Sequence, residues 1–312
     1  MKQLHAIYAF LCLGTLFTAV SCTDTDTDTG EPCTGTRSIA FTPAAETRAA
    51  VDKTANLQNF SVWGGYDEDA TNVFNGVTVQ APSWTYSGGT QYWIEEKTYQ
   101  FYAVHPATLP PGTTAAVATD GGITVTGFDC SATGSRAVDL MTATAQGYGS
   151  SPAPVALSFG HELARVKFSI QTEATVILSN ISLTGIAYKG TFSKEPNASG
   201  TWTDLTTAKG EAPFKTDDGG TLDANATIDL LGGDLLLIPQ TLTETSVFSM
   251  TWTYDDGTGK TVNVPLPEAG QKEWKRGISY HYSAVIPEQS SDIELTVSVG
   301  DWNDKKVNVD LQ

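Results

Sequence analysis

The chain has 312 residues, of which 40% are hydrophobic, so it is long enough for two ordinary domains with packed cores. Its 18 Lys and Arg stand against 35 Asp and Glu, which gives a formal net charge of −17 and makes nucleic acid an unfavourable partner, because such a surface repels phosphate. Charged residues are only 17% of the chain, too few for many long surface helices, so the composition predicts an all-β protein.

The first residues predict an export signal. Lys2 is followed by the apolar stretch Ala6–Val20, which is shorter than the roughly 20 residues that a membrane span needs. The stretch ends in Ala19-Val20-Ser21-Cys22, which resembles a bacterial lipobox, where the cysteine becomes the lipidated first residue. We therefore expect residues 1–21 to be a lipoprotein signal peptide and Cys22 to carry lipid. A plain secretory signal cleaved nearby is the alternative.

Residues 22–37 predict an acidic tether. Thr23–Gly30 alternates threonine with aspartate and contains no apolar residue, so it cannot join a core. The glycine and terminal glutamate of a calcium loop are missing, and we expect no metal here. Once the signal peptide has left and Cys22 carries lipid, Cys33 and Cys130 remain, and a disulfide between them stays open.

Residues 38–152 predict an N-terminal β-sandwich domain. Alternating apolar residues between turn signals predict strands at Ser38–Phe41, Leu57–Tyr66, Asn72–Gln80, Ser83–Tyr86, Tyr92–His105, Ile123–Phe128 and Leu140–Ala145. Asn75-Gly76 is a strong hairpin signal. Ala44–Thr54 predicts at most one helical turn, and Gln146–Pro154 predicts an interdomain linker.

Residues 153–312 predict a C-terminal domain of the same kind. The expected strands are Val155–Phe159, Leu163–Ile170, Ala174–Ile186, Thr227–Ile238, Ser246–Tyr254, Thr261–Leu266, Gly277–Ile286, Ile293–Val299 and Val307–Leu311. Between Lys189 and Gly220 the chain is rich in Gly, Asp, Pro and Thr, so most of it is expected to be loop. The sequence therefore predicts two tandem β-sandwich domains of the transthyretin or immunoglobulin type.

The sequence contains none of the common catalytic motifs, and we expect no enzyme, no cofactor and no metal site. His161-Glu162 begins like a zinc-protease pair, but Arg165 stands where the second histidine would be. His161 is therefore expected to be a structural, hydrogen-bonded residue of a strand. Most of the seven tryptophans lie in alternating strand patterns and are expected in the core, whereas Trp202 is the best candidate for an exposed aromatic.

The order of several aromatic and glycine-rich segments carries a family resemblance. They are Phe60–Tyr66, Trp84–Tyr86, Tyr92-Trp93, Tyr99–Pro106, Asp139–Ala143, Leu157–Phe168, Leu237–Gln240, Trp274–Tyr282 and Val297–Trp302. Spanning about residues 39–312 behind a lipobox, they resemble the fimbrillin family, the type V pilins and fimbrillin-like surface proteins of Bacteroidetes-type bacteria. The resemblance does not distinguish a shaft, anchor or tip subunit.

The resemblance implies a mechanism of assembly by strand addition. In such pilins a trypsin-like protease cuts after an Arg or Lys near the N-terminus, removes the first strand and leaves a groove that a strand of another subunit fills. Here the first strand would lie within about residues 38–48, with Arg48 as the processing site. Val307, Val309 and Leu311 would be the donor-strand positions. Alternatively, Arg48 is an ordinary loop residue and 307–311 is simply the last strand of its own sheet.

The resemblance thus implies a fimbrial subunit or fimbrium-associated adhesin. It would be a surface lipoprotein of the outer membrane that enters a fimbrium after processing. Its partners would be other fimbrial subunits, the outer membrane through the lipid anchor, and a host or bacterial surface ligand. The alternative function is a surface glycan-binding lipoprotein that uses exposed aromatics such as Trp202.

Overall fold

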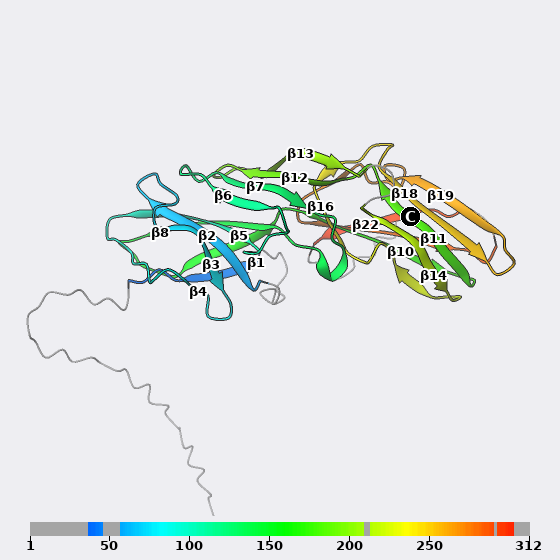
Figure 1. Ribbon diagram of the computed structural model, residues 1–312, viewed down its shortest axis with the longest axis horizontal. Helices are drawn as coiled ribbons and strands as arrows, with labels where there is room; N and C mark the ends of the chain where they lie inside the picture. Colours follow the sequence, from blue (N-terminus) through cyan, green and yellow to red (C-terminus); the bar gives the residue numbers. More distant parts are fainter. Residues whose placement is uncertain (1–36, 46–56, 209–212, 290–291, 303–312) are drawn as a thin grey trace, which may run out of the picture. The chain divides into compact units, whose positions relative to one another are not determined.

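The computed structural model describes residues 37–45, 57–208, 213–289 and 292–302 (Figure 1). Within these ranges the regular structure is β-strand, with one short 3₁₀ turn at Gly134–Arg136 and no α-helix. The prediction of an all-β protein is confirmed. No helix in the described ranges is long and apolar enough to cross a membrane.

The first sheet has seven strands. In spatial order they are β1 (Phe41–Ala45), β9 (Val155–His161), β8 (Met141–Tyr148), β5 (Thr98–His105), β2 (Asn59–Tyr66), β3 (Phe74–Gln80) and β4 (Thr85–Tyr86). All neighbours are antiparallel except β1 and β9, which are parallel, with Phe41 opposite Val155. Along β5, Phe101 and Tyr102 point to opposite faces, and both are buried, so this central strand is covered on both sides.

A four-stranded sheet packs on one of these faces. Its order is β13 (Thr201–Thr207), β12 (Ala187–Lys194), β7 (Ile123–Asp129) and β6 (Thr114–Val117). Tyr102 and Val104 of the seven-stranded sheet belong to the same buried cluster as Val125 and Phe128 of β7. The pairing of β7 with β12 and of β8 with β9 joins strands from both sides of the expected domain boundary after residue 152. The boundary itself stays a prediction.

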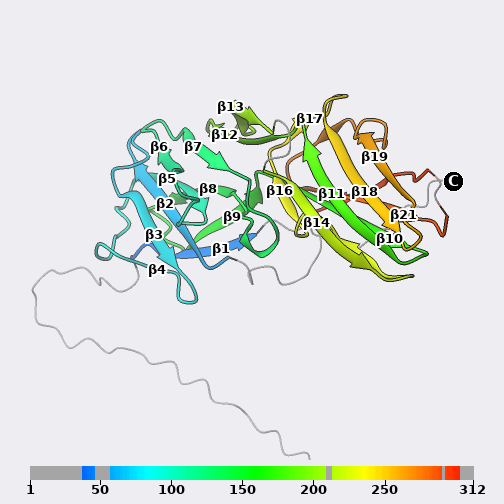
Figure 2. The same ribbon diagram turned by 45° about the vertical axis from the view of Figure 1, so that its right-hand side comes forward.

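The remaining large sheets form a β-sandwich. One contains β15 (Thr227–Asp229), β10 (Ala164–Thr172), β21 (Ile278–Ile286) and β22 (Thr296–Asp301), with β16 (Leu235–Leu237) also paired to β10. The other contains β14 (Lys215–Leu222), β11 (Val176–Thr184), β18 (Val247–Tyr254) and β19 (Gly259–Pro265), which lie side by side in Figure 2. Between them the Phe168 ring stacks on Phe248 at 4.8 Å and on Tyr282 at 4.9 Å. Two short strands, β17 (Gln240–Thr241) and β20 (Glu273–Trp274), pair separately.

Several element predictions were wrong, including the following three. The segment Lys189–Gly220, expected to be mostly loop, supplies most of β12, all of β13 and much of β14. Asn75-Gly76 does not form a hairpin turn: it lies inside β3, where Gly76 takes φ +69° next to a register shift against β2. The first residues of the expected linker, Gln146–Tyr148, continue β8.

The expectation that most tryptophans lie in the core is confirmed in the described residues, whereas the expectation for Trp202 is not. Four indoles are at most 5% exposed: Trp63, Trp93, Trp252 and Trp274. Trp202 is half-buried rather than exposed. Its place in β13 gives it one packed side and one side that borders a cavity, as described below.

Candidate functional site

The seven-stranded sheet curls until its two edge strands meet. Phe41 of β1 lies with its ring centroid 5.4 Å from that of Phe74 in β3 and 5.9 Å from that of Tyr86 in β4. The same ring is 6.1 Å from Phe60 and 5.8 Å from Phe101 in the strands between. These are edge-to-face contacts, the arrangement that aromatic pairs prefer. A single side chain of β1 therefore closes the inner face of the sheet.

Hydrogen bonds hold β1 and the residues before it on both sides. On the β9 side, the Val155 amide donates to the carbonyl oxygen of Ala40 at 2.7 Å. On the β4 side, the Ile39 amide donates to the carbonyl oxygen of Gln91 at 2.8 Å. The Tyr86 hydroxyl donates to the carbonyl oxygen of Ile39 at 2.9 Å. Burial raises the pKa of Tyr86, which keeps this phenol protonated and able to donate.

The surface that β1 covers is apolar and closely packed; we call it the β1 seat. It is formed by Phe60, Phe74, Tyr86, Phe101 and Val155 together with Leu157 and Phe159 of β9. Ile39 and Phe41 are 2% and 3% exposed on it. Burial of side chains of this size stabilises a fold by about 1.5–3 kcal/mol each. Because β1 pairs with the edge of β9 (Figure 2), removal of β1 would expose these apolar side chains.

The predicted functional residues lie outside the described residues. This applies to Cys22, Arg48, Val307, Val309 and Leu311. The described part of β1 ends at Ala45, shortly before Arg48 in the sequence. The last described strand, β22, ends at Asp301 and forms one edge of its sheet.

Cys130 is a buried thiol. Burial raises its pKa well above the ordinary range, so the reactive thiolate is not formed near neutral pH. Cys33 lies outside the described residues, and the disulfide between the two cysteines stays open.

His161 is a hydrogen-bonded residue of strand β9, as predicted. Its Nδ1 lies 2.8 Å from Oδ2 of Asp139, and its ring stacks on the Trp302 indole at 4.2 Å and 10°. Within the described ranges, no group of three or more His, Cys, Asp and Glu side chains is placed to hold a metal ion.

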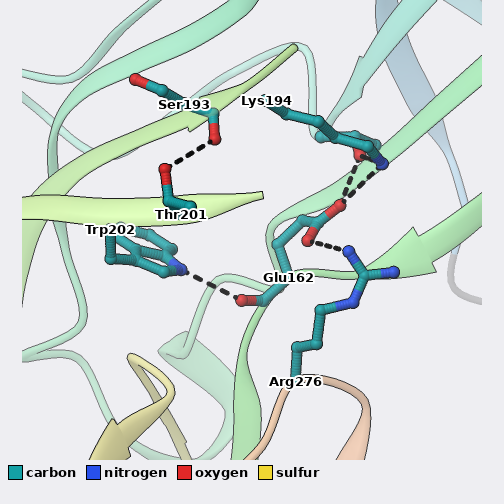
Figure 3. A network of polar contacts seen from close by, with 7 residues as sticks. Glu162, Ser193, Lys194, Thr201, Trp202 and Arg276 are labelled. Carbon is teal, nitrogen blue, oxygen red and sulfur yellow. Dashed lines mark hydrogen bonds and ion pairs between the residues drawn. The ribbon is translucent and has the colours of Figure 1, made fainter. Parts of the chain in front are cut away.

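The next residue, Glu162, carries a buried charge network that sequence reasoning missed (Figure 3). Its side chain is 1% exposed, and its carboxylate lies 3.2 Å from Lys194 Nζ and 2.8 Å from Arg276 Nη1. The Thr142 hydroxyl donates to the same carboxylate at 2.5 Å. The Trp202 indole N–H donates to the backbone carbonyl of Glu162 at 3.3 Å. The buried carboxylate thus has three partners, which is what compensates the desolvation of a charge.

A cavity of about 610 Å³ opens beside this network. It is bordered by Glu162, Gly185, Ala187, Gly200, Thr201, Trp202, Leu205, Thr207, Pro239, Gln240, Thr241, Thr243, Thr245 and Arg276. Trp202 was singled out from the sequence, but the cavity was not, because its walls come from five separate segments. Only the unusual Gly and Thr content around 185–207 could have signalled it.

The family of the chain follows from a comparison with family models. The fimbrillin-like model matches residues 47–302, which is most of the chain. The protein belongs to the fimbrillin-like family, and the resemblance noted in the sequence is confirmed.

Solved structures share the fold at low sequence identity. A candidate cell adhesion protein from Bacteroides uniformis has 19% identity and a TM-score of 0.53, with 85% of this chain and 99% of that chain covered. A fimbrial protein from Bacteroides vulgatus has 16% identity and a TM-score of 0.55, with 86% and 100% covered. No curated protein matches the chain.

Proposed function

We propose that the protein is a fimbrial subunit or fimbrium-associated adhesin that assembles by strand addition at the β1 seat. Proteolysis after Arg48 releases the segment that contains β1, and a strand of another subunit then occupies the open groove. Val307, Val309 and Leu311 are the donor positions that we propose. We expect no enzymatic activity.

One observation carries this proposal: β1 is the strand that closes the sheet. It is five residues long, it lies at an edge, and in the described part of the chain its pairing partner is β9, which runs parallel to it. The segment that includes β1 buries Ile39, which lies just before the strand, and Phe41, and an incoming strand with alternating apolar residues could replace them. Family membership and the fold shared with a fimbrial protein support the same function.

The test is cleavage with an arginine-specific protease, followed by electrophoresis in detergent without boiling. We expect the cut chain to begin at Ala49 and to form detergent-resistant ladders. Arg48→Lys is the matched variant, because it keeps the positive charge but is not cut, and it should stay monomeric. Arg37→Lys controls for the other arginine near β1 and should still form ladders. A chain that begins at Ala49 and remains monomeric would contradict the proposal.

We also propose that Cys22 anchors the protein in the outer membrane. Labelling of growing cells with an alkyne fatty acid should mark the wild-type chain and leave Cys22→Ala unmarked. The variant should be recovered in the soluble fraction. Equal labelling of the two chains would show that the lipid, if any, lies elsewhere.

A further inference from the structure

The cavity beside Glu162 has the size and lining of a small-ligand site. Its volume of about 610 Å³ lies inside the range of about 300–1,000 Å³ that is common for such sites. Trp202 and Leu205 both border it. Residues three apart in a regular strand face opposite sides, but Asp204 takes φ +52° and the pairing of β13 with β12 shifts register there. The bulge thus brings an indole and an isobutyl group to one wall.

The indole of Trp202 is held rigidly. Its ring lies edge-on to Phe128 at 6.0 Å and tilted to Phe192 at 5.3 Å, and its N–H is fixed by the carbonyl of Glu162. Leu205 is 46% exposed, an unusual value for a leucine of a strand. Together they provide a preorganised apolar surface that loses little entropy when a ligand packs on it.

The polar side chains that border the cavity are Arg276, Glu162, Gln240 and several threonines. Arg276 uses one terminal nitrogen to bind Glu162, and Figure 3 shows the other terminal nitrogen pointing away from that carboxylate. Thr207 and Thr241 make no side-chain hydrogen bond to any part of the chain that the structure describes. Lys194 and Arg276 carry two positive charges against the single negative charge of Glu162, so this network has a net positive charge even though the chain carries −17.

We propose that this cavity binds one pyranose unit at the end of a glycan. A pyranose has an apolar C–H face, which fits Trp202 and Leu205, and a polar edge, which fits Arg276 and the threonine hydroxyls. A purely aliphatic ligand would remove water from Arg276 without replacing its hydrogen bonds, which is costly. The ring edge that meets Arg276 can carry hydroxyls or a carboxylate. The proposal does not depend on strand addition, because the cavity borders β13 and not the β1 seat.

The test is binding of the full chain to a printed array that contains N-acetyllactosamine, mannotriose, sialyllactose and digalacturonate. We expect saturable binding to at least one of them. If only the neutral sugars bind, the sugar group that contacts Arg276 is a hydroxyl. If only the acidic sugars bind, that group is the sugar carboxylate. Absence of saturable binding to all four sugars overturns the proposal.

Two variants place the binding in this cavity. Leu205→Glu should weaken binding by about tenfold or more, which corresponds to about 1.4 kcal/mol. Ile177→Glu is its matched control, because Ile177 is a 48% exposed aliphatic residue of β11 that does not border the cavity, and it should bind normally. The double variant Thr207→Val and Thr241→Val removes two exposed hydroxyls and should also weaken binding. Equal affinity of Leu205→Glu and Ile177→Glu, both with wild-type melting temperature, would overturn the proposal.

Discussion

Among individual residues, Glu162 carries a buried negative charge whose desolvation its neighbours must compensate. Its carboxylate is almost fully buried, and two cations and a hydroxyl surround it. Loss of one cation leaves a buried charge that is only partly compensated, which costs more than the pair contributes when it is intact. The same residue fixes Arg276 and Trp202, so the network links the stability of the fold to the geometry of the cavity.

Lys194→Met tests this network. We expect the free energy of unfolding to fall by about 3 kcal/mol, because the variant removes a partner of a buried carboxylate. Lys167→Met is the control: Lys167 pairs with Asp229 at 2.7 Å, but the two side chains are 30% and 47% exposed. Exposed pairs contribute about 0–1 kcal/mol. Urea denaturation of both variants measures the difference, and equal losses would contradict the role assigned to Glu162.

His105 should make the protein sensitive to mild acid. Burial lowers its pKa below the ordinary value, although the carbonyl of Asn59 at 2.7 Å from its Nδ1 acts in the opposite direction. Below about pH 6.5 the unfolded chain binds a proton at this residue that the folded chain does not bind. Stability contributed by neutral His105 is therefore present above that pH and falls as the pH drops.

His105→Gln should reduce this acid sensitivity. The wild-type free energy of unfolding should fall by up to about 1.4 kcal/mol for each pH unit below 6.5 from this residue alone, until the folded-state pKa is reached. Urea denaturation at about pH 7 and about pH 5 measures the slope for both chains. A slope that the substitution leaves unchanged would show that other groups dominate.

Among the elements, β1 closes the seven-stranded sheet although it is only five residues long. Its neighbour β9 lies more than a hundred residues later in the sequence. The position that β1 occupies is therefore formed by a distant part of the chain. The contact is concentrated in Phe41, whose ring meets four others. The strand is thus held by one main side chain and a few backbone hydrogen bonds.

Phe41→Ala should therefore loosen β1 selectively. Truncation of a buried phenylalanine costs about 3–5 kcal/mol, and here most of that loss falls on one strand. We expect hydrogen exchange of the amides around Ile39 to accelerate, together with cleavage by an arginine-specific protease. Ala44→Ser, at an exposed position of the same strand, is the control and should leave both rates near wild type. Equal rates in the two variants would show that Phe41 does not hold the strand.

The elements also show where sequence reasoning succeeds and where it fails. Ile39 and Phe41 alternate clearly and were predicted to be in a strand, but the alternation contains no information about the partner β9. Between Lys189 and Gly220 the strands were missed because β13 and β14 are mostly exposed edge strands, so the apolar alternation that marks a half-buried strand is weak there. The cavity was missed for a related reason, since its lining residues come together only through the fold.

At the scale of the whole molecule, the four-stranded sheet joins the two halves of the sequence. β6 and β7 come from one half and β12 and β13 from the other, and Phe128 lies in a continuous core with residues as distant as Trp252. The seven-stranded sheet likewise needs β9 from beyond residue 152. No single cut of the chain separates these sheets without breaking a strand pair.

Separate production of residues 38–152 and 153–312 should therefore fail to give two folded fragments. The first fragment lacks β9 and β12, and the second lacks β7, which leaves Val125, Phe128 and Phe192 without their covering strands. We expect both fragments to aggregate or to lack cooperative unfolding, whereas the chain from residue 38 to 312 unfolds cooperatively. Circular dichroism during heating measures this, and two fragments with sharp transitions would support independent domains.

Because β1 closes the sheet, it affects when a strand of another molecule could pair at the same position. A strand that remains covalently attached through a short linker competes for its own position at an effective concentration in the millimolar range. Under the proposed assembly, a copy of the same chain at a lower concentration would therefore not displace it by mass action before the peptide bond is cut. In the proposed assembly, the N-terminal segment would keep each molecule unpaired until hydrolysis after Arg48, which would then commit that molecule to a strand of a neighbour.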